Sequence, residues 1–353
     1  MVVADALSLA DIWTWFAQEF DGYSPLYARI ARAVAADDEL LAMVERTPPR
    51  AHLPNVLLAA VHALLLGGLD HPLGAVYAGT SDAEPGPLFL ALCREHWSAV
   101  SDLMGRHHTN TNEVGRSAVI GPALTAAATG APIALIDVGC SAGLNLACDR
   151  YLLDYGPAGR TGPADAGLRI ECAVTGGSPP IAARLPEIAY RRGLDRDPVD
   201  IRDEESARWL LACIWPDTGR LDRTRLAIAE TRRDPPEIVA GDMVASIEAM
   251  VAAVPPGLVA VVLTTWSVAY LSPPDRIEFR ERLAAASRAR PVVWITADGA
   301  DVIEHLGAAP RTDEHGAEAS VLGLTRFAGG TVEDAGPLAY VQPHGAWIDW
   351  VAR

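Results

Sequence analysis

The pattern of apolar and polar residues divides the chain into a helical first third and a mixed remainder. Up to about residue 129, apolar side chains recur every three or four positions, as Ile12, Phe16 and Phe20 do, which is the spacing of one helix face. Ser8 and Ser24, the latter followed by proline, stand where helices are expected to begin. Helices that end at a glycine are predicted over residues 55–66, 87–104 and 112–129. No strand is predicted before residue 132.

From residue 132 onward, short apolar segments alternate with amphipathic ones, which is typical of a mostly parallel sheet covered by helices. Strands are predicted over residues 133–138, 187–194, 237–240, 258–264 and 291–296. An antiparallel hairpin, instead of another crossover, is predicted from two later segments, residues 319–327 and residues 338–342 with the following 347–350. An insert over residues 151–186 is rich in Gly and Pro, and a small hairpin is predicted near residues 168–174. The pattern therefore predicts an α/β fold after an N-terminal helical region.

Composition sets the class of protein and argues against several partners. With 353 residues, of which 50% are hydrophobic, the chain can bury one large core or two modest ones. Its net charge of −16 repels nucleic-acid phosphates and anionic lipids, and its basic residues form no cluster. We therefore expect neither nucleic-acid nor membrane partners.

The cysteines and the N-terminal segment bear on the compartment. Five scattered cysteines without a C-x-x-C pair favour reduced thiols over a disulfide framework or a zinc site, so no metal is expected. The N-terminal segment lacks the basic and apolar regions of a signal peptide, and the apolar segment 56–66 is too short to cross a bilayer. The expected location is the cytoplasm.

The most informative segment is IDVGCSAGLN, residues 136–145, which joins a buried strand to an expected helix. Asp137 ends the strand, and the small residues Gly139, Ser141 and Gly143 let a ligand approach the backbone. Amides at the start of the helix would face that ligand. Two chemistries use such a turn. One is a nucleotide-type cofactor site led by Asp137, and the other is a nucleophile elbow, because the turn also reads G-x-S-x-G.

Carboxylates follow three of the predicted strands. Asp137, Asp195 and Asp242 come at the carboxyl ends of the first, second and third strand, which is the edge where open α/β sheets bind ligands. A carboxylate after the second strand can accept both hydroxyls of a ribose, and one after the third can accept an adenine amino group. The alternative is that Asp195 and Asp242 are helix caps.

The chain resembles the core of class I S-adenosylmethionine-dependent methyltransferases over roughly residues 110–353, in the order IDVGCSAGLN, GLDRDP, VAGDM and LTTWSVAYL, followed by a terminal hairpin. Over nearly its whole length it is similar to an uncharacterised family of methyltransferase-like proteins of high-GC bacteria, in the runs SPLYARIA, PNVLLAAVHALL, HPLGAVY, TNTNEVGR, GCSAGLNL and QPHGAWIDW. The resemblance implies a Rossmann-like, seven-stranded sheet, mostly parallel with a C-terminal antiparallel hairpin, and S-adenosylmethionine as cofactor.

The resemblance also implies which residues hold the cofactor. They are Asp137, Gly139, Ser141 and Gly143 for the methionine part, Asp195 or Asp197 for the ribose, and Asp242 with Met243 for the adenine. Two features depart from the methyltransferase pattern. Asn145, still assigned to the cofactor turn, stands where a third glycine is usual. The gap from Asp137 to Asp195 is also far longer than the usual spacing of about twenty residues.

A polar cluster, HHTNTNEVGR, precedes the first strand and is expected near the mouth of the cofactor pocket. Arg116 could grip the cofactor carboxylate, and Asn112 and Glu113 could orient either ligand, which makes these two residues catalytic candidates. The alternative is a capping box, in which a threonine of this cluster caps a helix, Glu113 completes the box and Arg116 is solvated.

The segment after the fourth strand, TTWSVAY, lacks the N/D-P-P-Y loop of amino-methylating enzymes, which argues against an amide or adenine amino acceptor. Thr265 is a candidate cofactor contact. Trp266 and Tyr270 could face the sulfonium through cation–π contacts, and Tyr270 is the third catalytic candidate. The alternative is that both aromatic residues belong to the core.

Two other enzyme classes compete with this assignment. A serine hydrolase would use Ser141 as nucleophile with Asp298 and His344, in the chain order of α/β-hydrolases. However, that fold places strands before the elbow to supply an oxyanion loop, and here only helices are predicted there. A dinucleotide-dependent oxidoreductase would need G-x-G-x-x-G, which the turn lacks. A non-catalytic methyltransferase-like protein is a further alternative.

We predict an S-adenosylmethionine-binding enzyme, a methyltransferase that acts on a small molecule. Attack on another sulfonium carbon, in cyclisation or aminocarboxypropyl transfer, is the alternative. Residues 1–108 are predicted to form a helical lid or substrate region, and residues 109–353 the Rossmann-like cofactor domain with the insert 151–186. The helices could instead form a dimer surface, in which case the partner is a second copy of the chain.

Overall fold

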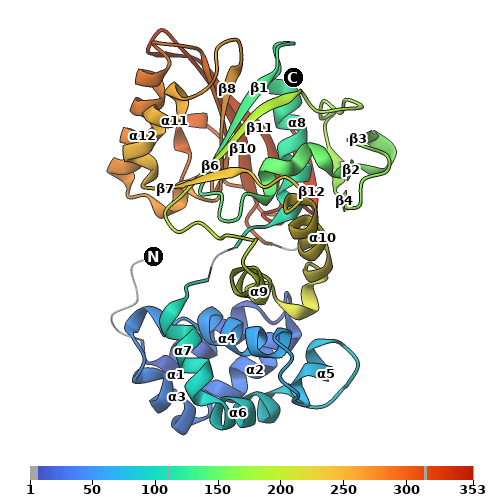
Figure 1. The fold of residues 1–353 in the computed structure, drawn as a ribbon, viewed down its shortest axis with the longest axis vertical. Helices are drawn as coiled ribbons and strands as arrows, with labels where there is room; N and C mark the ends of the chain where they lie inside the picture. The colour runs from blue at the N-terminus through green and yellow to red at the C-terminus, as the bar shows by residue number, and fades with distance from the viewer. Residues whose placement is uncertain (1–6, 110, 314–315, 353) are drawn as a thin grey trace. The chain divides into compact units, whose positions relative to one another are not determined.

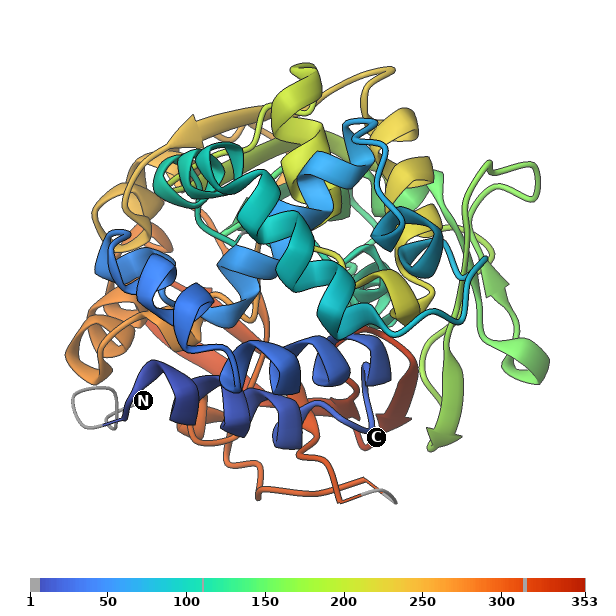
Figure 2. The ribbon, with the colours of Figure 1, turned by 90° about the horizontal axis from the view of Figure 1, so that it is seen from below.

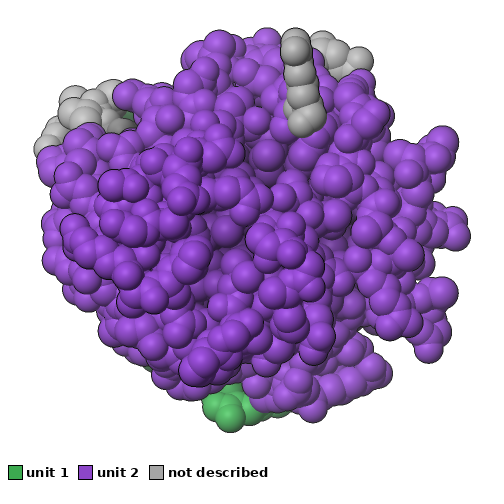
Figure 3. All heavy atoms as spheres, turned by 90° about the horizontal axis from the view of Figure 1, so that it is seen from above, with its two compact units in different colours: residues 1–111, 200–225 green, residues 112–199, 226–353 purple. Residues whose placement is uncertain are grey.

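The chain folds into two compact units, shown as ribbons in Figure 1 and as green and purple spheres in Figure 3. The computed structural model describes residues 7–109, 111–313 and 316–352. The first unit contains residues 1–111 and 200–225, and the second contains residues 112–199 and 226–353. The sequence predicts a boundary between residues 108 and 109 and leaves residues 200–225 with the sheet. This segment belongs with the N-terminal helices, because Trp209 and Trp215 pack on their core.

The first unit consists of helices that share one core. They are α1 (Leu9–Glu19), α2 (Pro25–Ala35), α3 (Asp38–Glu45), α4 (Pro54–Leu66), α5 (Leu73–Tyr77), α6 (Pro85–Glu95), α7 (Trp97–Arg106), α9 (Glu204–Ala212) and the beginning of α10 (Leu221–Thr231). Ser8 caps α1 and Ser24 caps α2, which confirms both predicted helix starts; these two helices lie side by side (Figure 2). The single helix predicted over residues 87–104 is instead two, because His96 leaves helical backbone angles (φ −115°, ψ 24°).

The second unit is built on a nine-stranded sheet with the order β5-β12-β11-β10-β9-β8-β1-β6-β7. Its strands are β1 (Ile133–Val138), β5 (Ala173–Gly176), β6 (Ile188–Asp195), β7 (Glu237–Ala240), β8 (Val259–Thr265), β9 (Val292–Asp298), β10 (Ser320–Ala328), β11 (Thr331–Val341) and β12 (Trp347–Trp350). Strands β7, β6, β1, β8 and β9 are parallel, and each of these five predicted strands is confirmed to within two residues. The mixed α/β class with a large, mostly parallel sheet is therefore confirmed.

The main sheet has nine strands where the sequence predicts seven, for two reasons. The predicted terminal hairpin is a three-stranded antiparallel meander, because the long strand β11 pairs with β10 on one side and with β12 on the other. The insert adds a further strand, because β5 pairs in parallel with β12 at the edge of the sheet.

The insert also forms a small second sheet. It contains β2 (Leu152–Asp154), β3 (Arg160–Thr161) and β4 (Arg169–Glu171), in the order β3-β2-β4. The hairpin predicted near residues 168–174 is wrong, because β4 pairs with β2 whereas β5 joins the main sheet. Local turn residues could not reveal this arrangement, since the partner of β5 lies near the C-terminus.

Helices cover both faces of the main sheet. The helices concerned are α8 (Ser117–Ala127), α11 (Met243–Ala252) and α12 (Pro273–Ala286). α11 and α12 pack on the face that carries Ala134 and Ile136, while α8 lies on the other side and contacts β9 and β10 (Figure 1). Because side chains alternate along a strand, Asp137 points to the side of α8.

The five parallel strands end at one edge of the sheet, which we call the carboxyl edge. From β1 the chain adds β6 and β7 on one side and later β8 and β9 on the other, so the connections diverge between β1 and β8. Open α/β sheets bind ligands outside the carboxyl ends of their strands at such a point. Strand β11 runs parallel to β9 through two antiparallel steps, so the turn at residues 342–346 also lies at the carboxyl edge.

The structure also bears on the state of the cysteines and on membrane-spanning segments. Cys93, Cys140, Cys148 and Cys172 are buried thiols, and burial raises the pKa of each thiol. These four residues are therefore packing groups and not reactive thiolates. None of the described helices combines the length and the apolar character that crossing a membrane requires.

Candidate functional site

The turn after β1 fits closely against its neighbours. Gly139, Ser141 and Gly143 all have a positive φ, of 78°, 54° and 72°. A Cβ atom on Gly139 would lie 2.4 Å from Cβ of Ser267, so only glycine fits at this position. Ser267 donates from Oγ to the carbonyl of Val138 (2.8 Å). The turn is thus held against the segment that follows β8.

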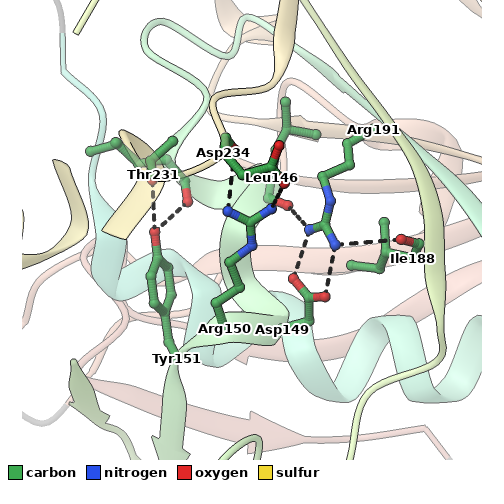
Figure 4. A network of polar contacts seen from close by, with 9 residues as sticks. Leu146, Asp149, Arg150, Tyr151, Ile188, Arg191, Thr231 and Asp234 are labelled. Atoms are coloured by element: carbon green, nitrogen blue, oxygen red, sulfur yellow. Dashed lines mark hydrogen bonds and ion pairs between the residues drawn. The ribbon is translucent and has the colours of Figure 1, made fainter. Parts of the chain in front are cut away.

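The helix predicted after this turn is instead a short 3₁₀ segment, η3 (Leu144–Arg150), because Ala147 leaves the helical region (φ −98°, ψ 16°). Side chains from neighbouring elements hold η3 in place (Figure 4). Arg191 of β6 donates to both oxygens of Asp149, at 2.7 and 2.9 Å. The hydroxyl of Tyr151 donates to the carbonyl of the first η3 residue (2.8 Å). Side-chain hydrogen bonds therefore hold the segments on both sides of the turn.

The predicted helix around residue 112 begins only at Ser117, because the residues before it contact η3. Oδ1 of Asn112 accepts the amide of Leu144 (2.9 Å). Nδ2 of Asn145 donates to the carbonyl of Glu113 (3.4 Å). The first amide after the turn, which the sequence predicts to face a ligand, is therefore bound within the chain.

Asp137 is the buried carboxylate at the end of β1. The residue is 1% exposed, and neither of its oxygens has a hydrogen-bond partner among the described residues. Its pKa is raised to about 7, mainly by burial and also by the charge of Asp195, against the opposing charge of Arg116. A buried carboxylate without partners costs free energy, so hydrogen-bond donors on a ligand would stabilise it.

Glu113 and His344 lie next to each other near the carboxyl edge. Glu113 is fully buried, and its Oε1 accepts the amide of Gly115 (2.8 Å), which makes it the cap of the 3₁₀ segment η2 (Val114–Arg116). Its Oε2 lies 3.4 Å from Nδ1 of His344. A Cβ atom on Gly345 would lie 2.0 Å from the carbonyl oxygen of Gly115, so glycine lets the β11–β12 turn approach η2.

Arg116 reaches the carboxyl edge from the end of η2. Its Nε donates to the carbonyl of Pro343 and its Nη1 to the carbonyl of Thr265, both at 3.1 Å. The guanidinium lies 4.2 Å from the ring centre of Trp266. Burial lowers the pKa of Arg116 to about 10. The nearby carboxylates that oppose this shift are those of Glu113, Asp298 and Asp137. Arg116 is therefore not the solvated residue of the capping-box alternative.

Two residues other than glycine have a positive φ in the described part of the chain, and both follow central strands. Ser141 follows β1. Trp266 (φ 55°) follows β8 and donates from Nε1 to Oγ of Ser320 (2.9 Å). Such angles are rare for these residue types, and backbone strain of this kind is concentrated at functional sites. Tyr270, the third catalytic candidate, is 90% exposed and is not part of the core.

Asp195 braces the turn and is not a helix cap. Its Oδ2 accepts the amide of Ser141 (2.7 Å), and its Oδ1 accepts the amide of the exposed Asp197 (2.9 Å). Although the insert separates Asp195 from Asp137 in the chain, β1 and β6 pair directly, with Asp137 opposite Gly193. Asp195 therefore reaches the carboxyl edge despite the long gap.

Asp242 is the cap of α11, as the helix-cap alternative states. Its Oδ1 accepts the amides of Ala245 (3.1 Å) and Val244 (2.9 Å), and its Oδ2 pairs with Arg196 (3.0 Å). The amide of Ala245 is the largest cause that lowers the pKa of Asp242, and Arg196 adds to it. Met243 begins α11 directly after this cap. The side chain of Asp242 is exposed, unlike that of Asp137.

Each unit contains a cavity. The cavity in the second unit has a volume of about 290 Å³, and Arg196, Asp242 and Tyr270 are among the residues that line it. These three residues follow β6, β7 and β8 at the carboxyl edge, and most of the remaining lining residues belong to α11 and α12. A larger, open cavity of about 390 Å³ in the first unit is lined by residues of α4, α7 and α9 and of the segments next to them.

Comparison with protein families shows the family to which the chain belongs. A family model described as "Uncharacterized protein conserved in bacteria (DUF2332)" matches residues 10–350. The chain belongs to this family. Comparison with curated proteins and with solved structures found no match. Membership of an uncharacterised bacterial family, which the sequence predicts, is thus confirmed, whereas the likeness to methyltransferases stays a prediction.

The hydrolase triad is not assembled in the DUF2332 chain. Oγ of Ser141 is buried and has no hydrogen-bond partner within the described ranges, so no base contacts it. Both oxygens of Asp298 accept backbone amides at 3.0 Å, and burial raises the pKa of this carboxyl to about 6. His344 lies beside Glu113. The three residues therefore have separate partners or none.

Three contacts that shape the site have no clear signal in the local sequence. They are the contacts of Gly139 with Ser267, of Arg116 with Pro343, and of Glu113 with His344. Each joins segments that only the strand order brings together at the carboxyl edge. The glycine in the turn QPHGAW is the one local sign, because an isolated glycine often marks a close approach of two backbones.

Proposed function

We propose that the DUF2332 chain binds S-adenosylmethionine at the carboxyl edge between β1 and β8 and transfers its methyl group to a small molecule. The observation that carries this proposal is the buried carboxylate of Asp137, which has no partner among the described residues and lies near the guanidinium of Arg116. The methionine end of the cofactor bears one ammonium and one carboxylate group. The negatively charged Asp137 and the positively charged Arg116, at one edge of the sheet, are complementary to these two charges.

The hydrogen bonds of the two residues fit this binding mode. An ionised carboxylate can accept about four hydrogen bonds, and Asp137 accepts none from the part of the chain that is described. Arg116 uses Nε and Nη1 for the carbonyls of Pro343 and Thr265, whereas the described residues give Nη2 no hydrogen bond. The ammonium of the cofactor would bind Asp137, and its carboxylate would bind Nη2 of Arg116.

The remaining carboxylates would hold the adenosyl part. Each oxygen of Asp195 accepts one amide and keeps a lone pair that could accept a ribose hydroxyl. Asp242 lines the cavity of about 290 Å³, where it and the amide of Met243 would contact adenine. The strand order β7-β6-β1-β8-β9 supports the Rossmann-like methyltransferase core that the resemblance implies.

S-adenosylmethionine would supply a methyl group activated by the positive charge on sulfur. The chain then has to place the acceptor in line with that methyl group and exclude water. Among the catalytic candidates, Glu113 is the best supported, because it is buried near Arg116. Oδ1 of Asn112 already accepts the amide of Leu144, and Tyr270 is exposed at the cavity wall.

Isothermal titration calorimetry with S-adenosylmethionine tests the proposal. Asp137→Asn should weaken binding by at least about tenfold, because it removes a charge-assisted contact worth about 1.5–3 kcal/mol. Asp334→Asn, which changes an exposed aspartate on β11 of the same unit, is the matched control and should bind as the wild type does. No heat with the wild type, or equal affinity in Asp137→Asn, would refute the proposal.

Product analysis separates methyl transfer from the other sulfonium reactions. Methyl transfer releases S-adenosylhomocysteine, whereas attack on another sulfonium carbon, in cyclisation or aminocarboxypropyl transfer, releases methylthioadenosine. Both products retain the adenosyl group, so chromatography of a reaction with labelled cofactor distinguishes them.

A serine hydrolase is the second candidate, and one observation favours it. Ser141 sits at the centre of G-x-S-x-G with a positive φ of 54°, as a strained nucleophile on a strand-to-helix turn would. A fluorophosphonate probe tests this reading, since it labels only activated serines. Labelling of the wild type that disappears in Ser141→Ala would favour the hydrolase, and an unlabelled wild type would exclude Ser141 as an activated nucleophile.

A further inference from the structure

The pair of Glu113 and His344 has the arrangement of an oriented imidazole. Glu113 is fully buried, and the amide of Gly115 fixes its Oε1 at 2.8 Å. Its Oε2 is therefore held in one direction, where it lies 3.4 Å from Nδ1 of His344. A carboxylate in this position favours the tautomer with the proton on Nδ1, which leaves Nε2 as the basic nitrogen.

The pair belongs to the same edge of the sheet as Asp137. The turn that carries His344 follows β11, whose carboxyl end lies at the carboxyl edge together with those of β1 and β8. The carbonyl of Pro343, the residue before His344, accepts a hydrogen bond from Nε of Arg116. The negative charges of Glu113 and Asp137 both interact with the Arg116 guanidinium. The side chain of His344 is 28% exposed, so a ligand at this edge can reach the ring.

We propose that His344, oriented by Glu113, is the general base of the site, and that the acceptor is a hydroxyl or thiol group that arrives protonated. This inference rests on the proposed methyl transfer. The acceptor oxygen or sulfur forms its new bond to the methyl carbon, while the sulfonium sulfur keeps the electron pair of the bond that breaks. The proton of the acceptor passes to Nε2 of His344, and the carboxylate of Glu113 stabilises the resulting imidazolium.

Hydroxyl and thiol acceptors follow from this arrangement. A base adjacent to the acceptor raises the nucleophilicity of O–H and S–H groups, which are weak nucleophiles while protonated. A neutral amine needs no such base before attack. The missing N/D-P-P-Y loop after β8, where the chain reads TTWSVAY, points in the same direction.

Nuclear magnetic resonance of the full chain labelled with ¹⁵N-histidine tests the orientation of the ring. At about pH 8, where an ordinary imidazole is neutral, long-range ¹H–¹⁵N correlations should show the proton of His344 on Nδ1, and loss of these signals in His344→Asn assigns them. In Glu113→Gln the ratio of the two tautomers should shift by about tenfold toward the Nε2–H form, because the carboxylate charge beside Nδ1 is lost. His305, stacked on Trp294 in the same unit, is the control and should not change.

A wild-type His344 with its proton on Nε2 would overturn the proposal without any variant, so the test stands even if Glu113→Gln does not fold. Unchanged tautomers in a folded Glu113→Gln would overturn it as well. Addition of S-adenosylmethionine should shift the signals of His344 and leave those of His305 in place. If calorimetry shows binding while His344 does not respond, the base assignment fails alone. If calorimetry shows no binding, the proposed function itself fails.

Discussion

Asp137→Asn should make the ligand-free protein more stable at neutral pH. The pKa of Asp137 is raised from 3.8 to about 7 in the folded chain, mainly by burial. Well below pH 4 both the folded and the unfolded state are protonated, so the residue does not affect the free energy of unfolding. As the pH rises, the unfolded state ionises first, and the folded state loses stability until the pH passes about 7. The difference between the two pKa values corresponds to about 4 kcal/mol.

Asparagine resembles the protonated acid in size and polarity but cannot ionise. The variant and the wild type should therefore have similar free energies of unfolding near pH 4, and above about pH 7 the variant should be the more stable by up to about 4 kcal/mol. Arg116 keeps the charges of Glu113 and Asp298 as partial compensation in the variant. A gain in stability together with a loss of cofactor affinity is expected for a residue that serves a ligand.

Urea unfolding measured at several pH values is the assay. Because the chain has two compact units, hydrogen exchange read on peptides of β1 assigns the change to the second unit. Asp334→Asn, on the exposed part of β11, should follow the wild type at every pH. An Asp137→Asn effect on the free energy of unfolding that is the same at about pH 4.5 and about pH 7.5 would show that Asp137 is not an uncompensated buried charge.

Three further predictions follow from the site. Gly139→Ala should lower the free energy of unfolding by about 1–3 kcal/mol, because φ is 78° and the new Cβ would meet Ser267; an unchanged urea midpoint would contradict the close packing. Asp242→Ala should cost about 1 kcal/mol through the lost cap of α11, and unchanged stability would show that the cap contributes little. The affinity for S-adenosylmethionine should fall about tenfold for each pH unit below about 7, because the ammonium of the ligand binds the ionised form of Asp137; calorimetry that gives the same affinity at about pH 6 and about pH 8 would contradict an ionic role.

The elements with a strong local signal could be predicted from the sequence. The five parallel strands are predictable because each is an apolar run bounded by turn residues. Ser8 and Ser24 mark helix starts because a hydroxyl there satisfies free amides. The sequence does not predict the break at His96, because the apolar period continues across it. The helix expected after Gly143 was wrong for a similar reason, since its apolar residues are buried in η3 by other contacts.

The candidate site was only partly predictable. Residues at strand ends, such as Asp137 and Asp195, could be chosen because parallel strands share a carboxyl edge. The position of a carboxylate at a strand end does not predict its structural role. Asp137 is buried without partners among the described residues, Asp195 braces the turn and Asp242 caps α11, although all three lie at the carboxyl ends of parallel strands. Burial and hydrogen-bond partners distinguish them, and both depend on side chains from other segments.

Apolar periodicity and turn residues indicate which face of a segment is buried, and both signals are local. The class of the fold and the position of most strands can therefore be predicted from the sequence. The pairing of β5 with β12 and the meeting of Glu113 with His344 depend on how distant segments pack. Such contacts stabilise the chain only after the sheet has formed, because bringing residues that are far apart in the sequence together costs conformational entropy. For this reason the contacts that define the site depend on the tertiary structure, although several of its residues, such as Asp137 and Asp195, could be chosen from the sequence.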